Sequence, residues 1–274
     1  MADKENGRFS RRFGFADHRG GELIRHDAPE SLRCGLLQAA IEAGLRPSPL
    51  RQVVCGTLRV RPNPANWSEY PNVLQEVEDL VHGCDWCRVY DIIEATYAGL
   101  PPHRKAGFET SINTLFAEEG IGWQLIDGEI QIRGDETFDA VVAQGRQIVE
   151  ASGMAVAHQE LREAIQDLSR RPEPDLSGAV QHAMAALECA ARETSGEAKP
   201  TLGELIKRYP DLFPKPIDEA VARLWGYASE QARHGRESRI LTWEEAQFVV
   251  GIVAILCSYV SQKLRKQDVG KSGA

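Results

Sequence analysis

The residues best suited to chemistry gather in one short segment of the chain, GYASEQARHGRESR, residues 226–239. It brings together four basic side chains and, just before them, one acidic one: Arg233, His234, Arg236, Arg239 and Glu230. Histidine can exchange a proton near neutral pH, and a guanidinium can hold a phosphate and its transition-state charge. Such a pair could cleave RNA without metal, because a base can activate the 2′-hydroxyl for attack on the adjacent phosphorus while arginine stabilises the dianionic intermediate. The alternative interpretation is a solvated loop between two helices.

A second chemical signal is the carboxylate of Glu188, which interrupts the small apolar stretch AMAALECAAR. A carboxylate is costly to bury unless it is paired, so an arginine of the RHGR segment is a plausible partner. Alternatively, Glu188 lies on the exposed stripe of its helix. The aromatic rings of Tyr227, Trp225 and Trp123 could stack on bases, although buried aromatics at element ends are the commoner case.

The remaining motifs give weaker signals of function. His82-Gly-Cys84-Asp-Trp-Cys87 holds one C-x-x-C with a nearby histidine, but no second pair completes a tetrahedral zinc site, so two half-buried thiols at a helix start are expected. The sequence has no Gly-rich phosphate loop, H-E-x-x-H motif or G-x-S-x-G elbow. We therefore expect no metal and no cofactor.

Composition indicates a globular protein that any RNA would contact only locally. The 274 residues allow two ordinary domains, and the net charge of -8 argues against a dedicated duplex binder. The polar N-terminus lacks the apolar core of a secretory signal, and the apolar run 248–260 is short for a membrane span, which favours a buried core helix. The six cysteines show no framework spacing, so reduced thiols and a cytoplasmic location are expected.

The elements that must position these residues are mainly helices. Apolar spacing and caps predict an N-terminal set of helices over residues 31–45, 73–84, 87–100, 108–119 and 136–168. Alternation around Asp127-Gly128 predicts a β-hairpin within 121–133. Residues 169–178 form the best linker, followed by helices over 177–192, 201–207, 217–230 and 242–266.

The stretches FSRRFGF, LRCGLL and EEGIGWQLIDGEIQI resemble the AbiJ-type N-terminal domain of phage abortive-infection proteins. The stretches SGAVQHAMAALECAARE, TLGELI, DEAVARLWGYASEQARHGRES and WEEAQFVVGIVAILCSYV resemble the HEPN-like domain often fused behind it. The resemblance implies an α+β domain over 1–168, an all-α HEPN-like bundle over 175–267 and a disordered tail over 268–274.

The function that this resemblance implies is a toxin-like, metal-independent endoribonuclease acting as a HEPN dimer. Arg233 and His234 fall where the family carries its Arg-His pair, with Glu188 on the helix that commonly supplies a polar residue. Supporting or RNA-binding roles would then fall to Glu230, Arg236, Arg239 and Tyr227. The expected partners are an RNA substrate, a second copy of the chain and a partner defence protein or antitoxin, with no membrane.

One departure leaves a second function open. HEPN ribonucleases typically show R-x(4–6)-H, whereas Arg233 and His234 are adjacent and would point about 100° apart in a regular helix. They can converge only if the helix is broken, which Gly235 permits, or if two protomers exchange them. Otherwise the domain would be a non-catalytic module that dimerises, senses infection or recruits a partner.

Overall fold

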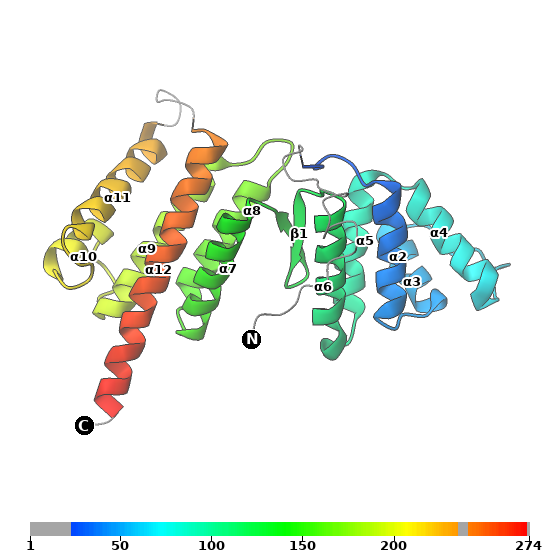
Figure 1. Cartoon of the computed structure of the whole chain (residues 1–274), viewed down its shortest axis with the longest axis horizontal. Helices are drawn as coiled ribbons and strands as arrows, with labels where there is room; N and C mark the ends of the chain where they lie inside the picture. Colours follow the sequence, from blue (N-terminus) through cyan, green and yellow to red (C-terminus); the bar gives the residue numbers. More distant parts are fainter. Residues whose placement is uncertain (1–22, 235–240, 273–274) are drawn as a thin grey trace, which may run out of the picture. The chain divides into compact units, whose positions relative to one another are not determined.

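The structure, a computed structural model, describes residues 23–234 and 241–272. Within these residues the regular elements are helices together with one two-stranded hairpin, which confirms the predicted mainly α class (Figure 1). The contacts divide the chain into two compact units that meet in sequence between Arg133 and Gly134. Each unit has a buried apolar core of its own.

Helices make up most of the N-terminal unit. Three agree closely with predicted ones: α2 (Glu30–Glu42), α4 (Leu74–Gly83) and α5 (Trp86–Gly99). The prediction lacked α3 (Pro47–Leu58) and the π-helical turn η1 (Glu69–Val73), and α6 (Pro102–Glu118) begins six residues earlier than predicted. Proline occupies the first turn of both α3 and α6, where the missing N–H costs nothing.

The hairpin forms where Asp127-Gly128 predicts it. Strand β1 (Trp123–Ile126) pairs antiparallel with β2 (Glu129–Ile132). The turn residues both adopt positive φ, 52° at Asp127 and 87° at Gly128, as a tight two-residue turn requires.

Side chains of α5 and α6 satisfy the outer edges of this hairpin. The Asn113 amide accepts a hydrogen bond from Leu125 N and donates one to Leu125 O, both at 2.7 Å. On the other strand, the Glu94 carboxylate accepts a hydrogen bond from Ile130 N at 2.7 Å. These contacts fix the hairpin on its helices and occupy backbone groups that an edge strand would otherwise expose.

The C-terminal unit is entirely helical over its described residues. Its elements are α7 (Glu136–Ala151), α8 (Ala155–Ser169), α9 (Leu176–Ser195), α10 (Leu202–Arg208), α11 (Ile217–His234) and α12 (Trp243–Ser272). The helical run predicted over 136–168 is divided at Gly153, whose φ of 75° suits glycine alone among common residues. Helix α12 extends past the predicted end at Lys266, into the segment predicted to be a disordered tail.

Helix α9 lies at the centre of this unit, packed against α8, α10, α11 and α12. Its buried face is rich in alanine, which lets neighbouring helices approach closely. Between α7 and α12 a glycine has the same role, because a Cβ on Gly145 would lie 2.8 Å from the carbonyl oxygen of Ala254.

The compact units differ from the predicted domain limits. The predicted N-terminal domain ended at residue 168, yet α7 packs against α12, and α8 packs against α9. Both helices therefore belong to the C-terminal unit, which begins at Gly134. The linker over 169–178 is correspondingly short, because α8 ends at Ser169 and α9 begins at Leu176.

Helix α12 is also, among the described residues, the one helix long and apolar enough to cross a membrane by length and composition. The window Trp243–Leu264 has a mean hydropathy of 1.5 and is 39% buried. One such helix is a weak indication of a membrane span, because a core helix of a soluble protein passes the same test. Its packing against α7 and α9 accounts for part of its apolar surface.

Candidate functional site

The backbone of Arg233 and His234 forms the last turn of α11. The helix thus continues four residues past its predicted end at Glu230, and adjacent positions in it are about 100° apart around the axis. No break in the helix brings these two positions together up to residue 234, the last described before the gap at 235–240. Arg236 and Arg239 lie outside the described residues, as do the side chains of Glu230, Arg233 and His234.

Glu188 has partners other than the predicted one. Its carboxylate pairs with Arg192 on the same helix, 2.6 Å from Oε1 to Nη2, and accepts a hydrogen bond from Leu202 N at 2.9 Å. With its side chain 21% exposed, Glu188 is neither buried without a partner nor fully solvated. Its described contacts thus tie the start of α10 to α9 rather than reaching the RHGR segment.

The aromatic side chains show structural contacts. Trp225 is half-buried, and its ring lies 3.4 Å from the place that a Cβ on Gly203 would take, so it packs against α10. Trp123 is buried and donates from Nε1 to Arg25 O at 3.2 Å. Tyr227 is half-buried on α11. A base could therefore stack on Trp123 only after local rearrangement.

Sequence reasoning missed a group of ionisable side chains between α8 and α9, which we call the His182 cluster: Glu160, Asp167, Arg170 and His182. The Nδ1 of His182 lies 2.8 Å from Glu160 Oε2, and its Nε2 lies 3.8 Å from Asp167 Oδ2. Arg170 reaches the other oxygen of Asp167 at 2.9 Å. Since His182 is 40% exposed and Arg170 is 60% exposed, both are accessible to a ligand.

Asp167 is the buried member of the His182 cluster. Its side chain is 2% exposed, and burial raises the pKa of its carboxyl, although Arg170 and His182 oppose that rise. The close approach of α9 depends on Gly178, where a Cβ would lie 2.4 Å from Asp167 Oδ2. No local motif announces this cluster, because its members come from two helices and meet only by packing.

The His182 cluster lies at the same end of the C-terminal unit as the last turn of α11. Helices α9 and α12 run in the same direction, because Cys189 acts electrostatically on Cys257 and, further along both helices, Thr194 Oγ1 donates to Val260 O. His182 near the start of α9 is therefore at the end where α12 begins, and α11 ends there too (Figure 1). This end of the unit carries the His182 cluster, between α8 and α9, and the positions of Arg233 and His234, on α11.

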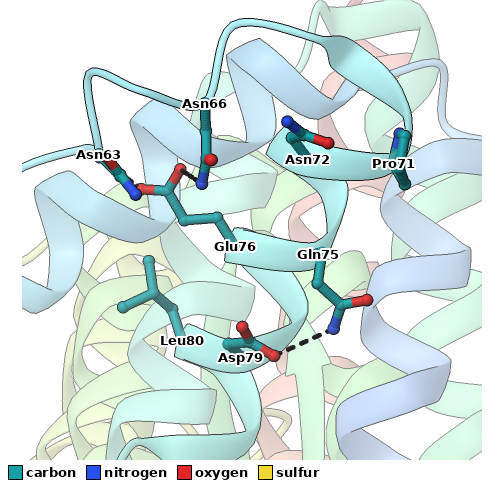
Figure 2. Close-up of a pocket in the computed structure, with 8 residues that line it drawn as sticks. All are labelled: Asn63, Asn66, Pro71, Asn72, Gln75, Glu76, Asp79 and Leu80. Atoms are coloured by element: carbon teal, nitrogen blue, oxygen red, sulfur yellow. Dashed lines mark hydrogen bonds between the residues drawn. The ribbon is translucent and has the colours of Figure 1, made fainter.

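The N-terminal unit has a pocket of about 580 Å³ with a mainly polar lining (Figure 2). Its wall consists of Asn63, Asn66, Pro71, Asn72, Gln75, Glu76, Asp79 and Leu80. Amide and carboxylate groups of this kind suit a ligand that forms many hydrogen bonds. Exposed Trp67 and Tyr70 flank the lining residues in sequence and could contact a larger partner.

Glu76 holds the loop that forms one side of this pocket. Its carboxylate accepts hydrogen bonds from Asn63 N at 2.6 Å and from Asn66 Nδ2 at 3.0 Å, and it pairs with Arg51 at 3.1 Å. Burial opposes ionisation of Glu76, but these hydrogen bonds and the arginine outweigh it and lower the pKa. The carboxylate is therefore charged and fully engaged. Two other lining residues bind each other, because Gln75 Nε2 donates a hydrogen bond to Asp79 Oδ1 at 3.0 Å (Figure 2).

The C-x-x-C segment differs in part from the expectation of two half-buried thiols. Cys84 is half-buried and burial raises its pKa, whereas Cys87 is exposed. His82 turns instead toward α2, where Glu30 and Cys34 place ligand-type atoms within 4.8 Å of one another and of the ring. The sequence predicts no metal, but these three residues form a group that could bind a metal ion.

Comparison with known proteins identifies the N-terminal half. The family described as AbiJ N-terminal domain 4 matches residues 7–145, just over half of the chain. No curated protein and no solved structure gives a significant match. The match begins just before the FSRRFGF stretch, passes the hairpin at 123–132 and ends within α7. The chain therefore belongs to the AbiJ N-terminal domain 4 family and is an abortive-infection-type protein.

Proposed function

We propose that this chain is a cytoplasmic defence protein whose C-terminal helical unit cleaves RNA without a metal. The observation that carries the proposal is that the last turn of α11 places Arg233 and His234 at the same end of that unit as the His182 cluster. Family membership supports the defence role. The resemblance of the helical unit to HEPN domains supports the reaction.

In the proposed reaction His234 takes the proton of a 2′-hydroxyl, and the resulting oxygen attacks the adjacent phosphorus. Arg233 stabilises the dianionic intermediate, with Arg236, Arg239 and Tyr227 holding the RNA. The bond between phosphorus and the 5′-oxygen then breaks and that oxygen takes up a proton, which leaves a 2′,3′-cyclic phosphate and a 5′-hydroxyl. Because adjacent helical positions diverge, the site is completed across a two-fold dimer, with Arg233 from one protomer facing His234 from the other.

Within this scheme Glu188 and the His182 cluster have different places. Glu188 is a positioning residue, because its described contacts hold α10 on α9. His182 and Arg170 supply an exposed histidine and an exposed guanidinium at the same end of the unit. They would contact RNA next to the scissile phosphate.

The test is cleavage of labelled cellular RNA in EDTA by the wild type and by Arg233→Ala and His234→Ala. We expect cyclic-phosphate ends from the wild type and a loss of roughly a hundredfold or more in each variant, the usual contribution of general acid–base groups. Arg223→Ala is the matched control, since Arg223 is an exposed arginine on the same helix. Equal cleavage by all four proteins, or none by a folded wild-type dimer, would exclude this site.

The second candidate function is a non-catalytic module that dimerises or binds a partner defence protein or antitoxin. It is favoured by the exposed large apolar side chains on α12, Phe248, Ile255 and Tyr259, whose spacing of seven and four residues places them along one face of the helix. Light scattering and RNA cleavage of the wild type and of Ile255→Glu separate the two functions. If Ile255→Glu loses both the dimer and RNA cleavage, the composite nuclease is supported. If the wild type is a dimer that does not cleave RNA, the module is supported.

A further inference from the structure

Three side chains that metals commonly bind converge at the junction of α2 and α4 in the N-terminal unit. Glu30 and Cys34 are one helical turn apart on α2, and His82 lies in the last turn of α4. The His82 Nε2 lies 3.1 Å from Glu30 Oε1 and 3.5 Å from Cys34 Sγ. One atom thus stands close to both a carboxylate oxygen and a thiol sulfur.

The other ring nitrogen of His82 decides which chemistry this contact suits. Nδ1 lies 2.7 Å from the carbonyl oxygen of Glu78, which can only accept a hydrogen bond, so Nδ1 carries the proton. In the neutral ring the lone pair is then on Nε2, directed toward Glu30 and Cys34. A histidine that donates one N–H to a carbonyl and offers the other nitrogen is the usual arrangement of a metal ligand.

The buried Arg33 holds the two helices in this register. Its guanidinium extends from α2 and donates hydrogen bonds to the carbonyl oxygens of Val81, His82 and Cys84 at the end of α4. It also donates to Ala28 O, just before α2. Because Arg33 is next to Cys34 in sequence and bonds the backbone of His82, the backbones that carry the three ligands are held together by a buried contact. The group is thus organised before any ion binds.

We propose that Glu30, Cys34 and His82 bind a divalent metal ion, with Zn²⁺ the best fit. Tetrahedral zinc with bonds of about 2.0–2.3 Å places its ligand atoms roughly 3.3–3.8 Å apart. The two nearest separations here, 3.1 and 3.5 Å, are close to those values, so small side-chain rotations complete the site. The mixture of sulfur, imidazole and carboxylate favours zinc over magnesium or calcium.

Three protein ligands leave one tetrahedral position for water or for an atom of a partner. The site is accessible, because Glu30 is 76% exposed and His82 is 28% exposed. It belongs to the N-terminal unit and takes no part in the proposed RNA cleavage. Without an ion, the same three residues would form only a surface ion pair between His82 and Glu30.

Titration of the reduced full-length protein with Co²⁺ tests the proposal, because a cobalt–thiolate bond has a charge-transfer absorption that a carboxylate or histidine site lacks. We expect this band in the wild type, bleached when Zn²⁺ is added. Cys34→Ala should abolish the band, and His82→Gln should weaken binding by roughly tenfold or more. Cys87→Ala is the matched control, since Cys87 is exposed and outside the group.

Circular dichroism of each variant establishes that it is folded, which is expected because Cys34 and Cys87 are exposed and His82 is partly exposed. Two results overturn the proposal. One is a wild type without the thiolate band, which means that His82 and Glu30 form an ion pair only. The other is a band that persists in Cys34→Ala, which assigns the metal to a different cysteine.

Discussion

His82 in the N-terminal unit and His182 in the C-terminal unit both lie between two helices and both have Nδ1 engaged, but by different groups. The carbonyl of Glu78 faces Nδ1 of His82, whereas the carboxylate of Glu160 faces Nδ1 of His182. On the other side, Nε2 of His82 faces a thiol and a carboxylate together, and Nε2 of His182 faces the buried Asp167.

The difference shows that the partner of one ring nitrogen sets the chemistry of the other. A carbonyl fixes the tautomer of His82 and leaves a lone pair for a metal ion. A carboxylate on each side of His182 can hold a proton on either nitrogen, so this ring suits proton transfer or contact with a phosphate. The same residue type thus predicts a metal ligand in one unit and an RNA-contacting residue in the other.

The largest effect should come from Arg33, the buried arginine beside His82. Arg33→Met leaves the carbonyl oxygens at the end of α4 without their buried donor, so we expect the free energy of unfolding to fall by about 3 kcal/mol. The same variant should lose Co²⁺ affinity, because α2 and α4 are no longer held in register. Urea denaturation and the cobalt titration measure the two effects.

Arg170→Ala is the counterpart in the C-terminal unit. Arg170 is 60% exposed, and exposed ion pairs contribute roughly 0–1 kcal/mol, so its removal should hardly change the unfolding midpoint. If both arginine variants lose the same stability, the two histidines are held in equivalent ways and the contrast between them is wrong.

A smaller effect separates positioning from catalysis at Glu188. Glu188→Ala removes the acceptor for Leu202 N and the pair with Arg192, which should lower the free energy of unfolding by about 1 kcal/mol. Thr201→Ala removes the side-chain cap of the same helix, α10, but leaves the Glu188 carboxylate in place. We expect the two variants to lose similar stability and to keep similar RNA cleavage at a temperature where both are folded.

A loss of cleavage confined to Glu188→Ala would contradict that expectation. Glu188 would then take part in the reaction itself, which is the role that the sequence predicts for it. It would also mean that the contacts with Arg192 and Leu202 are exchanged for others when RNA binds.

Local signals account for what the sequence predicted of the fold. The hairpin followed from Asp127-Gly128, because few other pairs adopt two positive φ angles in succession. Proline misled the prediction at α6, since Pro101-Pro102 ends one helix and also begins the next. The helical run over 136–168 gave no sign that its two halves pack on α9 and α12, because packing partners are not encoded in local periodicity.

The sites depend even more on distant residues. Cys34 and His82 are 48 residues apart in sequence, and Glu160 and His182 are 22 apart, so neither pair forms a motif. Glu188 was predicted either to pair with an arginine of the RHGR segment or to lie on an exposed stripe, whereas its arginine partner in the structure is Arg192, one turn further along its own helix. Residue type therefore indicated which side chains need partners, and only the packing of helices identified those partners.

The smallest expected effect concerns how pH acts on the His182 cluster. Burial raises the pKa of Asp167, so its carboxyl ionises less readily in the folded chain than in the unfolded one. As pH rises from about 4, the ordinary value for aspartate, the unfolded state ionises first and the wild type loses stability relative to Asp167→Asn, until pH passes the raised pKa. Urea denaturation of both proteins from pH 4 to pH 8 should show this change in their difference. A difference that stays constant, or that moves in favour of the wild type, would mean that Arg170 and His182 fully offset the burial of Asp167.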